Sequence, residues 1–351
     1  MNILLLGGSN AGISFGWASR FHALAHEHVV VNAFLGAVGS LYGLMRLREI
    51  ERAGAARPDL IILEYALNDM MLLDNGVLSL EMIDDALDDI ADFCARERIR
   101  LILLGLELRP PDRRRVRTCV DKVKRRYAAA AARRGLTYFT LDDILGGAKL
   151  DHFIDPYHLT AEASIEVADR LFAAMEAGVG VPRAVPDSAP RFEFTPVSLA
   201  QTDGHCQRVE LQSSVYRGDF LEIARGGSSR WPGHGRLVGL MMRSTHLSGE
   251  YRIETRAGAF RKNAQSSMRE IVPKLMLLHY SSRRLWARDD LVVSMPADKA
   301  SLARLRNDRT PTETPGLEPF DTQRLEIAAA AFWNKPPLRL RLLRRLGLLR
   351  E

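Results

Sequence analysis

Continuous apolar runs alternate with longer amphipathic stretches over residues 1–178 of the chain. Runs without polar interruption are typical of strands buried on both faces, and they lie at Ile3–Leu6, Val29–Asn32, Asp59–Glu64, Arg100–Leu104 and Thr137–Thr140. Apolar residues spaced three and four apart predict helices at Gly12–Ala25, Ser40–Ala53, Leu80–Glu97, Arg114–Arg133 and Thr160–Ala177. This alternation predicts a three-layer α/β fold with a parallel sheet. Functional residues in such folds gather outside the carboxyl ends of the strands.

The pattern changes at residues 179–190, which are rich in proline and are expected to form a linker. Residues 191–300 hold short strand-like runs separated by turn residues, which predicts a mainly-β domain, either a sandwich or a jelly roll. The runs are Phe192–Phe194, Arg208–Leu211, Phe220–Ile223, Leu237–Met242, Tyr251–Thr255, Lys274–Leu278 and Leu291–Ser294.

Residues 301–351 are expected to lie outside that domain, as a polar loop near Asn307–Pro319 and a basic, leucine-rich tail. Such a tail is expected to dock on the body of the protein or on a partner. The alternative is a helix that lies on a membrane surface.

Composition is that of a globular protein long enough for two domains: 351 residues, 46% hydrophobic and 26% charged. The net charge of +6 fits a solvated arginine-rich surface, with an anionic partner as the alternative. No basic stripe is interleaved with aromatics, so nucleic acid is not an expected partner. Three cysteines indicate no disulfide framework, and no apolar stretch is long enough to span a membrane. With no signal peptide evident, these features predict a cytoplasmic location.

The first candidate for chemistry is the segment from Gly7 to Gly12, Gly-Gly-Ser-Asn-Ala-Gly, directly after the first predicted strand. Glycines around Ser9 permit a tight turn from strand to helix. That turn would place the Ser9 hydroxyl at the carboxyl edge of the sheet, beside the N–H groups of a helix start. A structural turn or a phosphate-binding loop are the alternatives. The dinucleotide fingerprint is not met, because Ser9 stands at its second glycine.

Two further segments follow the second and third predicted strands. Gly36, or Gly39 as the alternative, can offer an unhindered N–H to an oxyanion. Asn68 can direct its side-chain amide into a site at the same edge, or can simply cap the next helix.

The fourth segment, Asp155-Pro-Tyr-His158, precedes the last predicted helix. A carboxylate three residues before an imidazole can accept its Nδ1–H and leave Nε2 free to act as a base. A purely structural histidine is the alternative for His158.

The order and spacing of these segments resemble the SGNH hydrolases, a branch of the GDSL esterases and lipases, over about residues 1–178. The resemblance implies a flavodoxin-like sheet, Ser9 as nucleophile, His158 as base and Asp155 as its partner. It also implies an oxyanion hole formed by Ser9, Gly36 and Asn68, with no metal and no cofactor.

The chain departs from the family pattern at two places. The family's Gly-Asp-Ser is Gly7-Gly8-Ser9 here, and its Gly-x-Asn-Asp begins with Ala66. Both departures spare the groups that do chemistry, so they bear on the substrate more than on activity.

The function implied is that of a serine esterase that hydrolyses a small acyl ester, such as acetyl on a carbohydrate, through an acyl-Ser9 intermediate. The expectation of a carbohydrate substrate has two grounds: SGNH relatives often remove acyl groups from sugars, and the β-rich second half resembles carbohydrate-binding modules. Both grounds are analogies at the level of fold. One alternative is an O-acyltransferase in polysaccharide or glycolipid assembly. The other is a non-catalytic carbohydrate-binding protein that retains the fold.

Overall fold

A computed structural model describes residues 1–110, 114–185, 189–212, 216–256, 258–266, 277–281, 285–308, 316 and 318–334. The chain divides into two compact units, Met1–Ala189 and Pro190–Glu351.

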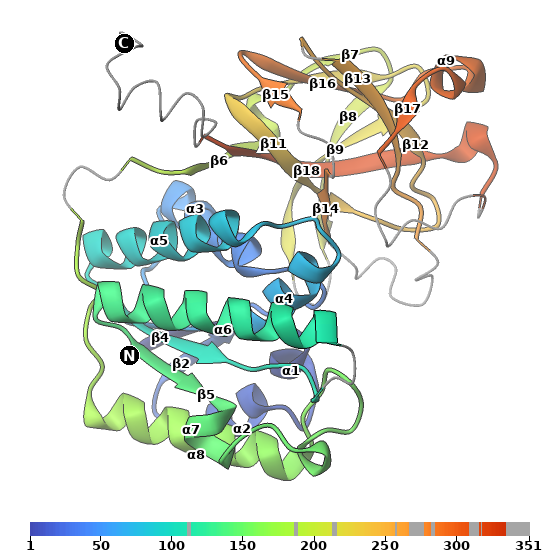
Figure 1. Cartoon of the computed structure of the whole chain (residues 1–351). Coiled ribbons are helices and arrows are strands. Elements are labelled where there is room, and N and C mark those ends of the chain that lie inside the picture. Colours follow the sequence, from blue (N-terminus) through green and yellow to red (C-terminus); the bar gives the residue numbers. More distant parts are fainter. Residues whose placement is uncertain are drawn as a thin grey trace, which may run out of the picture. The chain divides into compact units, whose positions relative to one another are not determined.

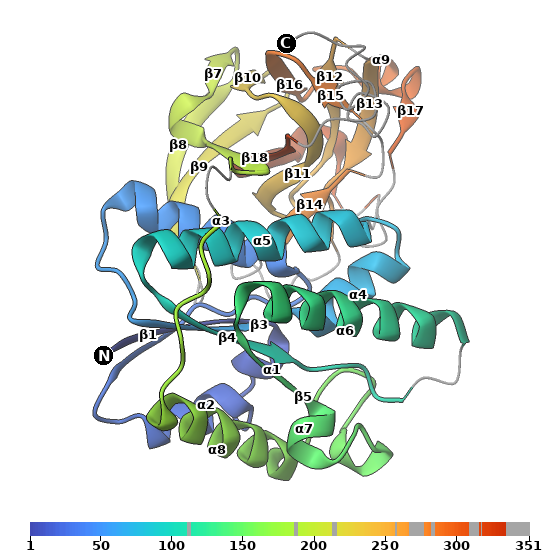
Figure 2. The same ribbon diagram turned by 60° about the vertical axis from the view of Figure 1, so that its left-hand side comes forward.

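The strands of the first unit form a parallel sheet, five-stranded in the described residues, with the order β2-β1-β3-β4-β5. They span β1 Asn2–Gly7, β2 Val29–Asn32, β3 Leu60–Glu64, β4 Arg100–Gly105 and β5 Thr137–Thr140. The helices span α1 Ser9–Gly12, α2 Trp17–Leu24, α3 Ser40–Ala53, α4 Ala66–Asp74, α5 Leu80–Glu97, α6 Arg114–Arg134, α7 Leu141–Leu145 and α8 Ala161–Ala177, with a short 3-10 turn at Leu150–His152. Helices α3, α5 and α6 cover one face of the sheet, and α2 and α8 cover the other (Figures 1 and 2). The predicted three-layer α/β fold is confirmed.

Local signals in the sequence explain most of these bounds. Every residue of β3 is buried, as its unbroken apolar run predicts. The Ser79 hydroxyl accepts a hydrogen bond from the N–H of Met82 and caps α5, and Thr160 caps α8 in the same way. At the end of α3, Gly54 takes a left-handed conformation, which ends the helix at Ala53.

The helix predicted at Gly12–Ala25 is wrong in its extent, because α1 ends at Gly12 and α2 covers only Trp17–Leu24. After α1 the chain folds back on itself so closely that a Cβ on Gly16 would lie 2.0 Å from the carbonyl oxygen of Asn10. Only glycine fits there, and α2 begins directly after it. The apolar pattern therefore continues across residues that do not form a helix.

The second unit is built from antiparallel strands, with one parallel pair between β13 and β17. Its described strands form a six-stranded sheet, β17-β13-β12-β16-β10-β7, and a seven-stranded sheet, β14-β11-β18-β9-β8 with β15 on β11 and β6 on β18. They span β6 Phe192–Pro196, β7 Gln201–Asp203, β8 Cys206–Gln212, β9 Arg217–Ala224, β10 Ser228–Pro232, β11 Gly235–Arg243, β12 Glu250–Thr255, β13 Gly258–Asn263, β14 Leu277–Tyr280, β15 Trp286–Ala287, β16 Asp290–Ser294, β17 Arg306–Asn307 and β18 Arg324–Trp333. A short helix, α9, spans Lys299–Ala303, and 3-10 turns lie at Val197–Leu199 and Phe320–Thr322.

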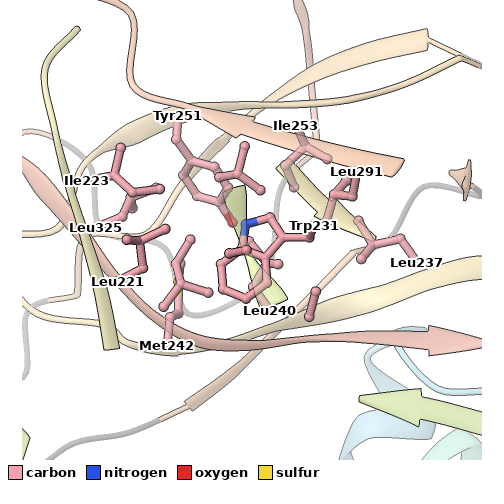
Figure 3. Packing of buried hydrophobic residues seen from close by; sticks show 14 of the residues in the cluster. Leu221, Ile223, Trp231, Leu237, Leu240, Met242, Tyr251, Ile253, Leu291 and Leu325 are labelled. Carbon is pink, nitrogen blue, oxygen red and sulfur yellow. The ribbon is translucent and has the colours of Figure 1, made fainter. Parts of the chain in front are cut away.

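Side chains from both sheets share one hydrophobic core (Figure 3). Trp231, Tyr251 and Leu291 enter it from the six-stranded sheet, and Leu221 and Met242 enter it from the seven-stranded sheet. Two sheets that face each other across one core define a sandwich, so the predicted mainly-β architecture is confirmed.

The prediction that residues 301–351 lie outside the β-rich domain is wrong for β18, which pairs with β11, β9 and β6. Nine of its ten residues are buried, among them the run Ala328–Ala331. A strand buried on both faces shows no alternation, and a run of alanines carries no strand signal of its own. The basic tail, parts of the loop at 307–319 and residues 274–276 of one predicted strand lie outside the described residues.

Candidate active site

The backbone turn between β1 and α1 holds Ser9 at the carboxyl edge of the sheet. The N–H of Gly8 lies 3.1 Å from the backbone oxygen of Glu64 and 3.0 Å from its carboxylate Oε2. Glu64 ends β3, the neighbouring strand, so this contact fixes the turn to the sheet. Ser9 follows as the first residue of α1.

Ser9, His158 and Asp155 are hydrogen-bonded in series. The Ser9 Oγ lies 2.8 Å from Nε2 of His158, although the two residues are 149 positions apart. The Nδ1 of His158 lies 2.7 Å from Oδ2 of Asp155. The structure therefore brings together the three residues that the sequence singles out as a nucleophile, a base and its partner.

The carboxyl group of Asp155 is held in its ionised form. Burial is the largest single influence and opposes ionisation, and the hydrogen bond from the His158 ring acts against it. With it act the backbone N–H groups of Tyr157, at 2.7 Å from Oδ1, and of His158, at 2.8 Å. Together they hold the pKa of Asp155 below its ordinary value. An ionised Asp155 accepts the Nδ1–H of His158, which leaves Nε2 as the acceptor facing Ser9.

Asn10, which the sequence reasoning missed, connects the His158 segment to the Ser9 turn. Its Nδ2 donates to the carbonyl of Tyr157 at 2.9 Å, and its Oδ1 accepts the N–H of Leu159 at 3.0 Å. Its position beside Ser9 is the only signal in the sequence, and spacing does not reveal its partners.

The predicted oxyanion-hole residues lie beside Ser9. A Cβ built on Gly36 would lie 3.4 Å from the Ser9 Cβ and 3.7 Å from its backbone nitrogen. The buried carboxamide of Asn68 packs on Gly8, where a Cβ would meet its Oδ1 at 2.2 Å. Gly36 and Asn68 thus border the Ser9 turn from two different segments.

Gly39, the alternative to Gly36, has a packing role. A Cβ at this position would lie 2.1 Å from Oδ1 of Asp69. That oxygen accepts the N–H of Ser40 at 2.9 Å, and the other carboxylate oxygen accepts the Tyr127 hydroxyl at 2.7 Å. Gly39 therefore makes room for a buried carboxylate that joins α3, α4 and α6.

Two fully buried carboxyl groups lie beneath this edge of the sheet. Burial raises the pKa of Glu64 to about 8, and the Gly8 N–H opposes that shift only in part. Burial also raises the pKa of Asp69 to about 6, against the hydrogen bonds from Tyr127 and Ser40. Near neutral pH, Glu64 is therefore mostly protonated, whereas Asp155 is ionised.

The side chain of Tyr157 is exposed next to His158. It is 40% exposed, and the two rings lie edge to face with their centroids 6.4 Å apart. Exposed aromatic side chains of this kind present an apolar face with a polar tip to a ligand.

An α/β sheet with this hydrogen-bonded series at its carboxyl edge is typical of the class of serine hydrolases. Residues 7–164 match the model of the GDSL-like lipase/acylhydrolase family. The first unit is therefore a GDSL-like lipase/acylhydrolase domain, and the predicted resemblance to the SGNH hydrolases is confirmed. The chain is thus an ester hydrolase.

Solved structures extend the likeness to both units. A two-domain esterase, CEX, active on acetylated mannans, matches with a TM-score of 0.60 and 14% identity, over 96% of this chain and 92% of that chain. The same esterase co-crystallised with mannopentaose matches with a TM-score of 0.55 and 12% identity, over 96% and 91%. At these identities the likeness is one of fold. No curated protein matches the chain.

Among the described residues, no helix is both long and apolar enough to cross a membrane.

Proposed function

We propose that the chain is a serine esterase that removes a small acyl group, such as acetyl, from a carbohydrate through an acyl-Ser9 intermediate. The observation that carries this proposal is the series Ser9 Oγ, His158 Nε2, His158 Nδ1 and Asp155 Oδ2, joined at 2.8 and 2.7 Å.

Proton transfer in the proposed mechanism follows these contacts. His158 takes the hydroxyl proton as Ser9 Oγ attacks the ester carbonyl, and Asp155 stabilises the imidazolium that forms. His158 then gives the proton to the departing alcohol, and the acyl group stays on Ser9. Water attacks the acyl carbonyl while His158 removes its proton, and the acid leaves as Ser9 regains its hydrogen.

The negative charge of the tetrahedral intermediate needs donors that already face it. The proposed donors are the N–H groups of Ser9 and Gly36 and the side-chain amide of Asn68. The Ser9 N–H is supported as a donor because Ser9 begins α1, and the first N–H groups of a helix lack acceptors within the helix. Gly36 and Asn68 are supported by their position beside the Ser9 turn. Removal of one such donor typically costs about 3 to 4 kcal/mol of transition-state stabilisation.

The carbohydrate substrate is supported by two observations. The solved structure that matches over both units is an esterase active on acetylated mannans. In addition, Tyr157 exposes its ring next to His158, the residue that gives a proton to the alcohol in the proposed mechanism. Aromatic rings are suited to stack on the apolar faces of sugars, so the ring would contact the alcohol part of the ester.

A cytoplasmic location also stays a proposal. It is supported by the three cysteines, Cys94, Cys119 and Cys206, all of which are free.

The proposal is tested by incubation of the purified chain with acetylated manno- and xylo-oligosaccharides and with 4-nitrophenyl acetate. We expect acetate release from at least one sugar ester, its loss in Ser9→Ala, and a higher KM for the sugar ester alone in Tyr157→Ala. Acetyl found on an added sugar acceptor instead of in free acetate would show a transferase. Equal turnover by Ser9→Ala and the wild type would reject the proposed mechanism.

A further inference from the structure

The side chain of Asn10 uses both ends of its carboxamide on the two residues that flank His158. Its Nδ2 donates to the carbonyl oxygen of Tyr157 at 2.9 Å, and its Oδ1 accepts the N–H of Leu159 at 3.0 Å. Asn10 is 2% exposed and directly follows Ser9. The buried side chain of Asn10 therefore connects the backbone on either side of His158 to the turn that carries Ser9.

The chemistry of an amide explains why asparagine suits this position. A carboxamide carries a donor and an acceptor on one planar group, so it can pair with a carbonyl and an N–H two residues apart, as a neighbouring strand does. Two bonds to one short segment restrict its rotation as well as its distance. Without the amide, the partly buried carbonyl of Tyr157 and the buried N–H of Leu159 would both lose their partner.

The segment around His158 makes other hydrogen bonds, within itself and to the chain after β4. The Asp155 carboxylate binds the ring and the backbone N–H of His158, which fixes these two residues to each other. The carbonyl of Pro156 accepts the N–H of Arg109, which ties the segment to the chain after β4. Besides the contact between His158 Nε2 and Ser9 Oγ itself, the two Asn10 bonds tie the backbone of this segment to the turn that carries Ser9.

We infer that Asn10 is a positioning residue for the reaction: its paired hydrogen bonds set the separation between Ser9 Oγ and His158 Nε2. The inference rests on the proposed roles of Ser9 and His158. A misplacement of about 1 Å between reacting groups typically costs about 100-fold in rate. Because the bonds act on the base and not on the substrate, their loss lowers kcat and leaves KM little changed.

Asn10→Ala is compared with Asn32→Ala, a matched control. Asn32 also uses its side-chain Nδ2 close to Ser9, donating to the carbonyl of Ala11 in α1 at 2.7 Å, and this bond holds α1 rather than the backbone around His158. With 4-nitrophenyl acetate, we expect about a 100-fold lower kcat in Asn10→Ala. Asn32→Ala should lose thermal stability with a kcat close to that of the wild type.

The pH dependence of kcat in Asn10→Asp distinguishes a positioning role from a purely structural one. An ionised aspartate can still accept from the N–H of Leu159, but it sets an anionic oxygen against the carbonyl of Tyr157. A protonated aspartate regains a donor for that carbonyl. The ratio of its kcat to that of the wild type should therefore rise as the pH falls.

A double-mutant cycle with Asp155→Ala completes the test. If both residues act through His158, their combined loss of kcat is smaller than the product of the single losses. Asn10→Ala with near-normal kcat, or equal kcat losses in Asn10→Ala and Asn32→Ala, would overturn the inference. A ratio of the Asn10→Asp kcat to the wild-type kcat that does not change with pH would also overturn it. Turnover retained in Ser9→Ala would instead overturn the proposed function.

Discussion

The carboxamide of Asn68 lies directly against the Cα of Gly8, so that a Cβ on Gly8 would meet the Asn68 Oδ1 at 2.2 Å. Gly8 is also where the chain departs from the family pattern, which has an aspartate at this position. In this chain a side chain at position 8 would have to displace the Asn68 amide from its present place. Gly8 and Asn68 therefore depend on each other.

Gly8→Ala should reduce activity more than it reduces stability. The added methyl group meets a side-chain amide that can rotate away, but rotation removes Asn68 from its proposed role at the oxyanion. We expect kcat to fall by about 100-fold or more, as measured with 4-nitrophenyl acetate. Gly180→Ala is the control, because a Cβ there meets nothing within 4 Å. Equal kcat values in the two variants would contradict this account.

Gly36 and Gly39 should respond differently to alanine. At Gly39 the Cβ would lie 2.1 Å from Asp69 Oδ1, a buried oxygen, so we expect a loss of about 1 to 3 kcal/mol in unfolding free energy. At Gly36 the Cβ would lie 3.4 Å from the Ser9 Cβ, which leaves room to fold but fills space beside the hydroxyl. Gly36→Ala should therefore keep its stability and lose kcat. Urea unfolding and kinetics on both variants decide, and the reverse pattern would be evidence for Gly39 at the oxyanion.

Asp155→Asn should remove activity while the fold persists. An asparagine side chain can present its N–H to His158 Nδ1, which favours the tautomer with the proton on Nε2. His158 then cannot accept the Ser9 proton, and losses of about 10,000-fold in kcat are known for this kind of change. Thermal unfolding should remain cooperative. Less than a tenfold loss in kcat would reject the assigned role of Asp155.

Glu64 should make the protein less stable as the pH rises towards 8. Its pKa is about 8 in the folded state against an ordinary value of 4.5, so folding takes up a proton between these values. The stability that this group contributes is complete below pH 4.5 and is lost as the pH rises to about 8. Relative to Glu64→Gln, the unfolding free energy of the wild type should fall by about 1.4 kcal/mol per pH unit in this window. Urea unfolding at pH 5, 6 and 7 measures the difference, and a constant difference would contradict the shift.

The first unit could be predicted closely because its signals are local. The unbroken apolar runs of a parallel sheet and the caps of α3 and α5 mark their own bounds, so Ser40–Ala53 and Leu80–Glu97 agree with the helices observed. The break between α1 and α2 could not be predicted, because it depends on how closely Gly16 approaches the Asn10 carbonyl. In the second unit, β18 is held by its neighbours on both sides, and its alanines give no local signal.

The residues of the candidate site likewise divide into those that the sequence predicts and those that only the fold reveals. Ser9, Asp155 and His158 stand out by residue type and by position after predicted strands. Asn10 and Glu64 act through backbone groups of residues 56 to 149 positions away, and no spacing rule reveals such partners. The proposal of Gly36 rather than Gly39 likewise depends on the position of Asp69, which only the fold supplies.

Covalent labelling measures whether His158 activates Ser9 for attack. Treatment with a fluorophosphonate, followed by mass spectrometry of the peptides, should place a single adduct on Ser9 in the wild-type chain. Ser9→Ala should take up no label, and His158→Ala should take it up orders of magnitude more slowly. An adduct on another residue, or labelling of Ser9 at the same rate without His158, would contradict the account.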